Sequence, residues 1–136
     1  MAGETTFTVE VLTPEGELFN GEVVQLSTRT VAGEIGVLAN HVPILAQLRP
    51  TRLRLRLSDS ETREWAQGHG MVQVFGNHAQ VLLEEAIEPD RLDPAALADE
   101  KADAEARLSD AEASEAARKL AARDLERIEA FLGIAA

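Results

Sequence analysis

Cysteine and tyrosine are both absent from this sequence of 136 residues. Without cysteine the chain has neither a disulfide framework nor a thiolate metal site, so redox chemistry does not identify its compartment. Its aromatic residues are four phenylalanines and one tryptophan. The core must therefore be built mainly from aliphatic side chains, and nucleic-acid bases would find few stacking platforms.

Positive charge and long apolar runs are also scarce. The sequence contains 13 Lys and Arg and 24 Asp and Glu, which gives a formal net charge of -11. Such a charge repels phosphate backbones and anionic lipid headgroups, so we expect no nucleic-acid partner and no direct lipid insertion. Residues 1–6 lack the pattern of a signal peptide, and no run approaches ~20 apolar residues. We expect a chain that reaches a membrane only by holding a partner.

Signatures of catalysis are missing as well. The three histidines have no helical partner at metal-ligand spacing, and no nucleophile motif is present. Residues 33–36 read GEIG but lack the lysine of a P-loop, so a turn between strands is the stronger interpretation. We predict no enzyme, no metal and no cofactor. An enzyme would require His41, His69 and His78 to converge with a carboxylate, and we interpret His69, between two glycines, as a tight backbone position.

In the part of the chain expected to form the first domain, residues 1–90, apolar and polar side chains alternate from Phe7 to about Leu83 with the period of a β-strand. Phe7, Val9 and Val11 alternate with polar residues, and residues 52–57 read RLRLRL, with leucines facing inward and arginines outward. Turn residues, among them Asn20-Gly21, separate the segments. The candidate strands are 7–11, 17–19, 23–30, 35–38, 44–48, 52–57, 63–66, 71–75 and 79–83. The fold expected for this part is an antiparallel β-sandwich of about ten short strands, with a flattened barrel as the alternative.

Residues 91–136 have the composition of helices. Asp93 and Pro94 form an N-cap and first-turn pair, which predicts a helix to about residue 108. A second helix is expected from near Ser114 to a C-cap at Gly133. Two antiparallel helices would form a hairpin. Its expected apolar positions are Leu97, Ala104 and Leu108 in the first helix, and Ala117, Leu120, Ala121, Leu125, Ile128 and Leu132 in the second.

The seam between these helices is thin because alanine lines much of it. At ~25 cal/mol per Å² of apolar area, it contributes only a few kcal/mol against the entropy of ordering the helices. The hairpin should therefore be able to detach or open. Its basic residues concentrate in the second helix, where they could pair across the hairpin or meet an acidic partner: Arg118, Lys119, Arg123 and Arg127.

Residues 33–48 read GEIGVLANHVPILAQL, which resembles the hallmark of ATP synthase epsilon subunits. The segments VEVLTP at 9–14, LFNG at 18–21 and GHGMVQV at 68–74 resemble other parts of that bacterial family. The family has Pro-Gly where this chain has Ala39-Asn40, and Asn can still adopt a left-handed backbone. Its glycine pair near residue 70 is interrupted here by His69.

The resemblance implies a non-catalytic rotor subunit of a proton-translocating F-type ATP synthase at the cytoplasmic face of the cell membrane. The sandwich would grip the gamma shaft and stand on the ring of c subunits, with Glu34 and His41 facing the ring. The hairpin would extend toward the α/β catalytic subunits and inhibit ATP hydrolysis through the four basic residues of its second helix. The alternative is a free-standing β-sandwich that binds a small ligand and carries a helical oligomerisation tail.

Some relatives bind ATP through a motif at the start of the first helix. Leu92 and Asp93 match that motif, but Ala96 stands where the phosphate-binding arginine would be. Asp103 and Asp124 occupy positions of further arginines, and carboxylates near a triphosphate add repulsion. We therefore expect weak or absent ATP binding.

Overall fold

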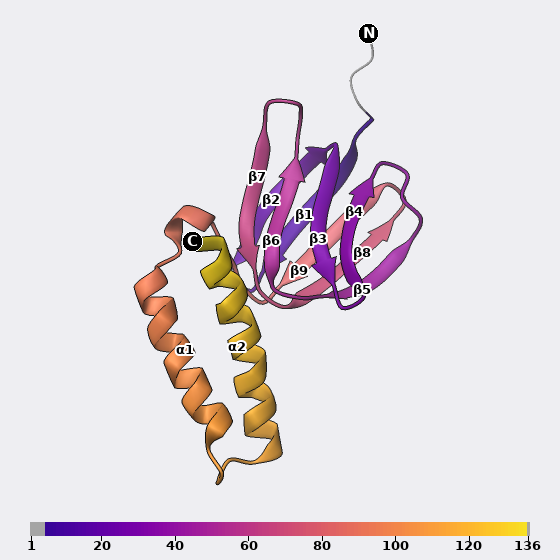
Figure 1. Cartoon of the computed structure of the whole chain (residues 1–136). Helices are drawn as coiled ribbons and strands as arrows, with labels where there is room; N and C mark the ends of the chain where they lie inside the picture. Colours follow the sequence, from indigo (N-terminus) through magenta and orange to yellow (C-terminus); the bar gives the residue numbers. More distant parts are fainter. Residues whose placement is uncertain (1–4, 136) are drawn as a thin grey trace.

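The computed structural model describes residues 5–135, which form ten β-strands, a short 3₁₀ helix and two α-helices (Figure 1). The strands are β1 (Phe7–Thr13), β2 (Gly16–Val23), β3 (Gln25–Thr30), β4 (Gly33–Leu38), β5 (Ile44–Leu48), β6 (Thr51–Arg56), β7 (Thr62–Gln67), β8 (Gly70–Phe75), β9 (His78–Leu83) and β10 (Ala86–Ile87). The helices are η1 (Pro89–Arg91), α1 (Pro94–Ser109) and α2 (Glu115–Ala135). The predicted order, a β-sandwich followed by a two-helix hairpin, is confirmed.

The ten strands form one continuous sheet that bends into two layers. The order along the sheet is β10-β7-β6-β3-β5-β8-β9-β1-β2, and β4 pairs with the free side of β3. Only Thr30 and Leu48 join β3 to β5, so the sheet turns its corner there. Strands β4, β3, β6 and β7 form the layer nearer the viewer in Figure 1, and β5, β8, β9, β1 and β2 form the layer behind. The ladders are antiparallel except for that between β1 and β9, which is parallel.

The alternating patterns in the sequence point to the core correctly. Leu53 and Leu55 are fully buried while Arg54 between them is exposed, and Phe7, Val9 and Val11 face the same interior. The other buried members of this cluster are Val23, Leu26, Val37, Leu48, Trp65, Val72, Val74, Ala79, Val81 and Leu83. Aliphatic side chains thus fill the space between the layers, as the scarcity of aromatic residues requires.

Two local predictions in the sheet fail. Asn20-Gly21 is not a turn, because β2 continues through it and pairs Gly21 with Val9. A side chain at position 21 would lie 3.3 Å from the ring of Phe19, so this glycine makes room for an aromatic neighbour. Strand β10 was not predicted, because two residues are too short to show a period.

The first helix begins as the sequence predicts. The Asp93 side chain accepts hydrogen bonds from the backbone amides of Ala95 and Ala96, and Pro94 occupies the first turn. The predicted cap at Gly133 is wrong, because α2 runs through this residue to Ala135. Gly133 is exposed and has helical residues on both sides, so it lowers the helix propensity without ending the helix.

The apolar seam of the hairpin is shifted relative to the prediction. Leu108, Ala117 and Leu120 are exposed, whereas Phe131 is fully buried although it lay outside the expected stripe. These exposed residues lie toward the α1–α2 turn, which projects away from the sandwich in Figure 1. Ala121 is buried as predicted, and the other buried residues of α2 lie toward the opposite end, where β7 also covers the helices. The buried cluster there consists of Ala66 of β7 with Leu97, Ala104, Ile128 and Phe131.

Neither helix in residues 5–135 combines the length and the hydrophobicity that crossing a bilayer requires.

Candidate interaction surfaces

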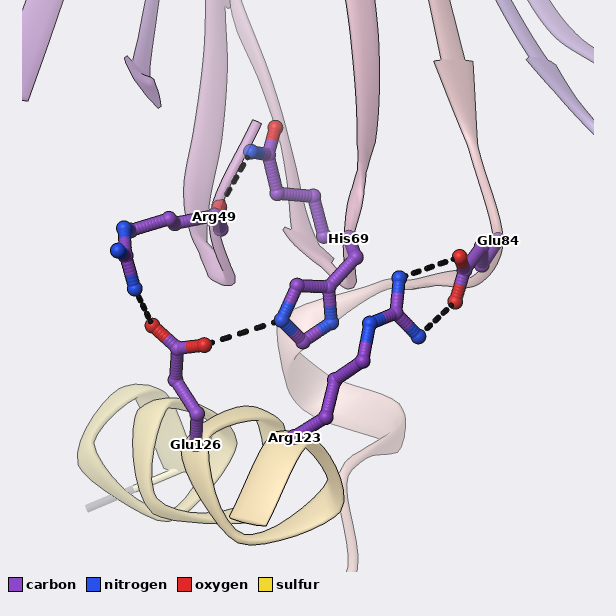
Figure 2. A network of polar contacts seen from close by, with 6 residues as sticks. Arg49, His69, Glu84, Arg123 and Glu126 are labelled. Carbon is purple, nitrogen blue, oxygen red and sulfur yellow. Dashed lines mark hydrogen bonds and ion pairs between the residues drawn. The ribbon is translucent and has the colours of Figure 1, made fainter. Parts of the chain in front are cut away.

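A cluster of polar side chains joins helix α2 to one end of the sandwich (Figure 2). Its members are Arg49, His69, Glu84, Arg123 and Glu126, and we call them the latch. The first three follow the ends of β5, β7 and β9, and the last two lie on α2. Since these three strand ends meet at the same edge of the molecule, residues far apart in sequence face one helix.

Each carboxylate of the latch bridges the sandwich and the helix. Glu126 accepts a hydrogen bond from Nη1 of Arg49 at 2.6 Å and lies 3.0 Å from Nε2 of His69 through its other oxygen. Glu84 accepts two hydrogen bonds from the guanidinium of Arg123, at 2.8 and 2.6 Å. Bidentate geometry of this kind fixes orientation as well as distance.

The sandwich holds its half of the latch rigidly. The buried side chain of Gln67 donates to the carbonyl of Arg49 at 2.8 Å and accepts from the hydroxyl of Thr28 at 2.7 Å. The carbonyl of His69 accepts from the amide of Glu84 at 2.9 Å. Gly70 permits this close approach, because a Cβ atom there would lie 2.0 Å from the carbonyl oxygen of Leu82.

The pairings shift the titration of both latch carboxylates. Burial alone would raise the pKa of Glu126, but hydrogen bonds from His69 and Arg49 and their charges hold it below its usual value. The hydrogen bonds from Arg123 are the main cause that lowers the pKa of Glu84, and they raise the pKa of Arg123 in turn. Both carboxylates are therefore ionised at neutral pH and available to hold the helix.

The four predicted inhibitory residues divide into two pairs. Arg123 and Arg127 contact the sandwich, since Arg127 reaches Glu85 at 3.2 Å besides Glu100 of α1 at 3.4 Å. Arg118 instead donates to the carbonyl of Asp110, and Lys119 lies 3.5 Å from Glu115 on its own helix. A docked hairpin thus engages two of the four cations on the sandwich and leaves two within the hairpin.

Glu34 and His41 lie apart in the structure. Glu34 is exposed near the start of β4, opposite Arg29 of β3, whereas His41 follows the other end of that strand. The Nδ1 atom of His41 is 2.7 Å from the carbonyl oxygen of Val42. Asn40 has a φ of 65°, the left-handed conformation that the sequence permits in place of glycine. Contact of either side chain with a c ring stays a prediction.

The three histidines do not converge. His41 contacts its own neighbour, His78 lies 2.7 Å from Glu10, and His69 belongs to the latch. Residues 5–135 contain no group of three His, Cys, Asp or Glu placed to hold a metal ion. The contact of His69 with Glu126 was missed because 57 residues separate the partners and no spacing rule links them. Our interpretation of His69 as a backbone position accounted for its glycine neighbours but not for its side chain.

The degenerate nucleotide motif at Leu92 and Asp93 serves the hairpin itself. Asp93 caps α1, and Leu92 packs against the small cluster around Phe131. Asp103 and Asp124 lie on facing helices and both contact Arg107, at 3.0 and 3.1 Å. Two carboxylates therefore pair with this guanidinium.

A further surface covers the outer side of the β5-β8-β9 layer. Leu45, Met71, Phe75 and Leu82 alternate with core residues on these strands, so their side chains point away from the interior. Their exposed fractions are 67%, 40%, 69% and 44%. We call these four residues the outer apolar face. Gln73 and Gln80 lie between them, so the surface carries little charge. Exposed apolar side chains that gather on one face mark interaction sites on soluble proteins.

Comparison with known proteins gives consistent results. Residues 6–89 match the family described as ATP synthase, Delta/Epsilon chain, beta-sandwich domain. The chain is similar to an ATP synthase epsilon chain of Persephonella marina, 43% identical over 60% of each chain. It is 38% identical to that of Ruminococcus albus, over 89% of this chain and 90% of the relative. The match spans less than two thirds of the length of the Persephonella marina relative, and the same holds for the epsilon chain of a Sulfurihydrogenibium species, which is 37% identical over 64% of its length.

Solved structures share the fold. A chain of the Euglena gracilis mitochondrial ATP synthase aligns with 98% of this chain and 83% of its own length. The TM-score is 0.82 at 21% identity, a level at which the likeness concerns the fold. The relation includes the helices as well as the sandwich, because the aligned share of this chain extends well past residue 89.

Proposed function

This chain belongs to the ATP synthase delta/epsilon chain family, and on that premise we propose that it is a non-catalytic subunit of the central stalk. In this role the sandwich couples the gamma shaft to the ring of c subunits during proton-driven ATP synthesis. The chain acts by binding and has no active site of its own. It would lie at the cytoplasmic face of the cell membrane, held there through the complex.

The observation that carries the proposal is the outer apolar face. A rotor subunit needs a permanent protein interface, and exposed leucine, methionine and phenylalanine side chains of a rigid sheet supply one. The charge of -11 makes nucleic acid and anionic lipid poor occupants of the same surface. We assign this face to the gamma shaft. Glu34 and His41, at the two ends of β4, are assigned to the ring.

The hairpin supplies a conditional interface in this proposal. When it leaves the sandwich, Arg123 and Arg127 lose Glu84 and Glu85 and become available to acidic loops of the catalytic subunits. Arg118 and Lys119 lie on the same helix and extend the basic surface. Each exposed ion pair contributes ~0 to 1 kcal/mol, so several must act together to slow ATP hydrolysis.

We also propose that ATP binds weakly or not at all. The carboxylates of Asp103 and Asp124 already occupy Arg107, and Ala96 offers no cation. Titration calorimetry on the whole chain should show no saturable heat with ATP. Tight binding would overturn this part of the proposal without affecting the stalk role.

The test of the stalk role is reconstitution with the cognate α, β and gamma subunits. Phe75→Asp places a charge within the proposed gamma interface, on its most exposed apolar side chain, and should weaken binding more than tenfold. Leu120→Asp is the matched control, because Leu120 is 62% exposed on the hairpin and lies outside that interface. Equal binding by both variants would contradict the assignment of the face.

The brake is tested in the same preparation. A version of the chain that ends at Arg91 should bind the catalytic head and give faster ATP hydrolysis than the whole chain. Equal rates would remove the brake and leave the coupling role intact. The alternative, a free-standing ligand-binding sandwich, is not favoured by the family relation, and the aliphatic core fills the space between the layers.

A further inference from the structure

Arginine side chains gather on the outer side of the layer that β4, β3, β6 and β7 form (Figure 1). On β6 they alternate with buried leucines, and one more lies on β3; we call these four residues the arginine face: Arg29, Arg52, Arg54 and Arg56. We propose that the arginine face binds an extended acidic segment of a partner protein. This interaction goes beyond the stalk role, since the outer apolar face lies on the other layer.

The register of the strands shapes a hollow in this face. Ser27 of β3 lies opposite Arg54 of β6 on one side and opposite Gly36 of β4 on the other. Because Gly36 has no side chain, the surface is open there, and the residues that line the hollow include Gln25 and Arg52. A side chain that enters the hollow therefore meets hydrogen-bond donors from two strands.

The cations of this face exceed the carboxylates near them. Arg52 and Arg54 share one carboxylate, that of Glu64, at 2.6 and 2.8 Å. Arg29 has no ion pair with any residue of 5–135, and Glu34 opposite it is the one carboxylate that β3, β4 and β6 themselves carry. The face is therefore positive within a chain of net charge -11. Charge complementarity favours an acidic partner for it.

Hydrogen-bond donors around the hollow remain available to a ligand. Arg52 donates to Glu64 through Nη1 and Arg54 through Nε, so each guanidinium keeps further N–H groups. Within residues 5–135, neither the side-chain amide of Gln25 nor the hydroxyl of Ser27 forms a hydrogen bond. Carboxylates suit these donors, because hydrogen bonds between guanidinium and carboxylate groups are assisted by charge and are stronger than neutral ones.

The spacing of the arginines matches an extended chain. Arg52 and Arg54 stand two positions apart on one strand, which separates them by about 7 Å. Alternate side chains of an extended peptide repeat at the same distance, so two acidic residues reach both guanidiniums. A peptide also brings backbone N–H donors for Glu34, which a phosphodiester backbone lacks. The net charge of -11 further repels any long polyanion that extends past the face.

The test is fluorescence anisotropy with the whole chain and a short labelled peptide in which glutamate alternates with serine. The matched probe is the same peptide with glutamine in place of each glutamate. The glutamine peptide should bind at least about tenfold more weakly at low salt. Binding of the glutamate peptide should weaken as salt rises from about 0.05 M to about 0.5 M, because the contacts are exposed. Equal affinities of the two peptides would overturn the proposal.

Substitutions in the chain locate the bound peptide. Arg54→Gln and Arg29→Gln each remove one cation of the face and should weaken binding about threefold or more. Ser27→Asp keeps every arginine but places a carboxylate in the hollow, so it should weaken binding as well. Lys119→Gln is the matched control, because it removes the same charge from an exposed site on the hairpin. If this control weakened binding equally, net charge would explain the interaction and the proposal would fail.

Two further measurements complete the test. Arg29 and Arg54 are exposed, so their substitution should leave the urea midpoint followed by Trp65 fluorescence unchanged. Inorganic phosphate at constant ionic strength should displace the labelled peptide less readily than unlabelled glutamate peptide does. Equal displacement by phosphate would show a site for any anion and would overturn the assignment to a protein segment. Since no other subunit is present, either result leaves the stalk role standing.

Discussion

The sandwich and the hairpin are stabilised in different ways. Between the two layers of the sheet, buried aliphatic residues such as Leu55 and Val81 exclude water over the full length of the strands. The hairpin buries few residues, and its largest buried side chain, Phe131, lies at the end nearest the sandwich. Apolar burial does not depend on titration and is not screened by salt, whereas ion pairs respond to both.

The junction repeats this difference at close range. Ala66 of β7 gives α2 a small apolar contact, and the charged latch supplies the rest. The same 136 residues thus contain a core held by apolar packing and a junction held mainly by ion pairs. The sandwich and the hairpin should respond differently to mutation, and experiments can contradict this expectation.

The largest effect is expected in the sandwich core. Leu55→Ala removes a fully buried side chain of β6 and should lower the free energy of unfolding by about 3 kcal/mol. Urea denaturation followed by Trp65 fluorescence measures this loss, because Trp65 is buried in the same cluster. Leu45→Ala is the control, since its side chain is 67% exposed and should change stability by less than about 0.5 kcal/mol.

The second effect should stay within the hairpin. Phe131→Ala removes the largest side chain of the small cluster and should weaken docking by about 2 kcal/mol. This is less than in a core, because the substitution cannot destabilise the hairpin's docking any further once the hairpin has left the sandwich. Hydrogen exchange should quicken in α1 and α2 and remain unchanged in β1 and β9. Faster exchange throughout the sandwich would show that the two parts are one cooperative unit.

The sequence predicted the parts that depend on local patterns. The alternation of Leu53 and Leu55 with arginines predicted strand β6, and Asp93 with Pro94 predicted the start of α1. The packing of the hairpin on the sandwich could not be predicted in this way. Phe131 is buried in a cluster that includes Ala66 of a distant strand, whereas no residue of 5–135 covers Leu120 near the tip.

The candidate surfaces show the same limit. The pattern of residues 33–48 pointed to the family, and the basic residues of α2 were recognised as a group. The sequence did not predict that these residues divide between two sets of partners. Arg123 contacts Glu84 of the sandwich, whereas Arg118 caps the turn before its own helix. Pairs such as His69 with Glu126 arise from tertiary structure, and sequence spacing carries no trace of them.

A smaller effect is expected from the ion pairs of the latch. Glu84→Gln removes the partner of Arg123 and should weaken docking by about 0.5 kcal/mol, since both side chains are about half exposed and solvent screens them. The loss should shrink further as salt rises. Energy transfer between labels on the β1–β2 turn and the hairpin tip measures it. Glu115→Gln, which loses only its contact with Lys119 on the same helix, is the control.

The same pair gives docking a pH dependence at the acid end. The pKa of Glu84 is lowered in the docked state, mainly by hydrogen bonds from Arg123, so its contribution is present above the ordinary pKa of a carboxyl group. It is lost as the pH falls through the lowered value. Docking should therefore weaken in acid, and Glu84→Gln should flatten that decline. An unchanged decline would assign it to Glu126 alone.

An effect as small as that of the ion pairs tests whether helix propensity limits the hairpin. Gly133 lies inside α2, and a Cβ atom there would meet no other atom within 4 Å. Gly133→Ala should therefore stabilise the helix by about 0.5 kcal/mol, because alanine loses less entropy on folding. Ala117→Gly, on the exposed side of the same helix, should have the opposite sign. Thermal unfolding followed by circular dichroism at 222 nm, about the helical minimum, compares the two. If either substitution shifted the unfolding of the sandwich as much as that of the helices, the hairpin would not be a separately stabilised part.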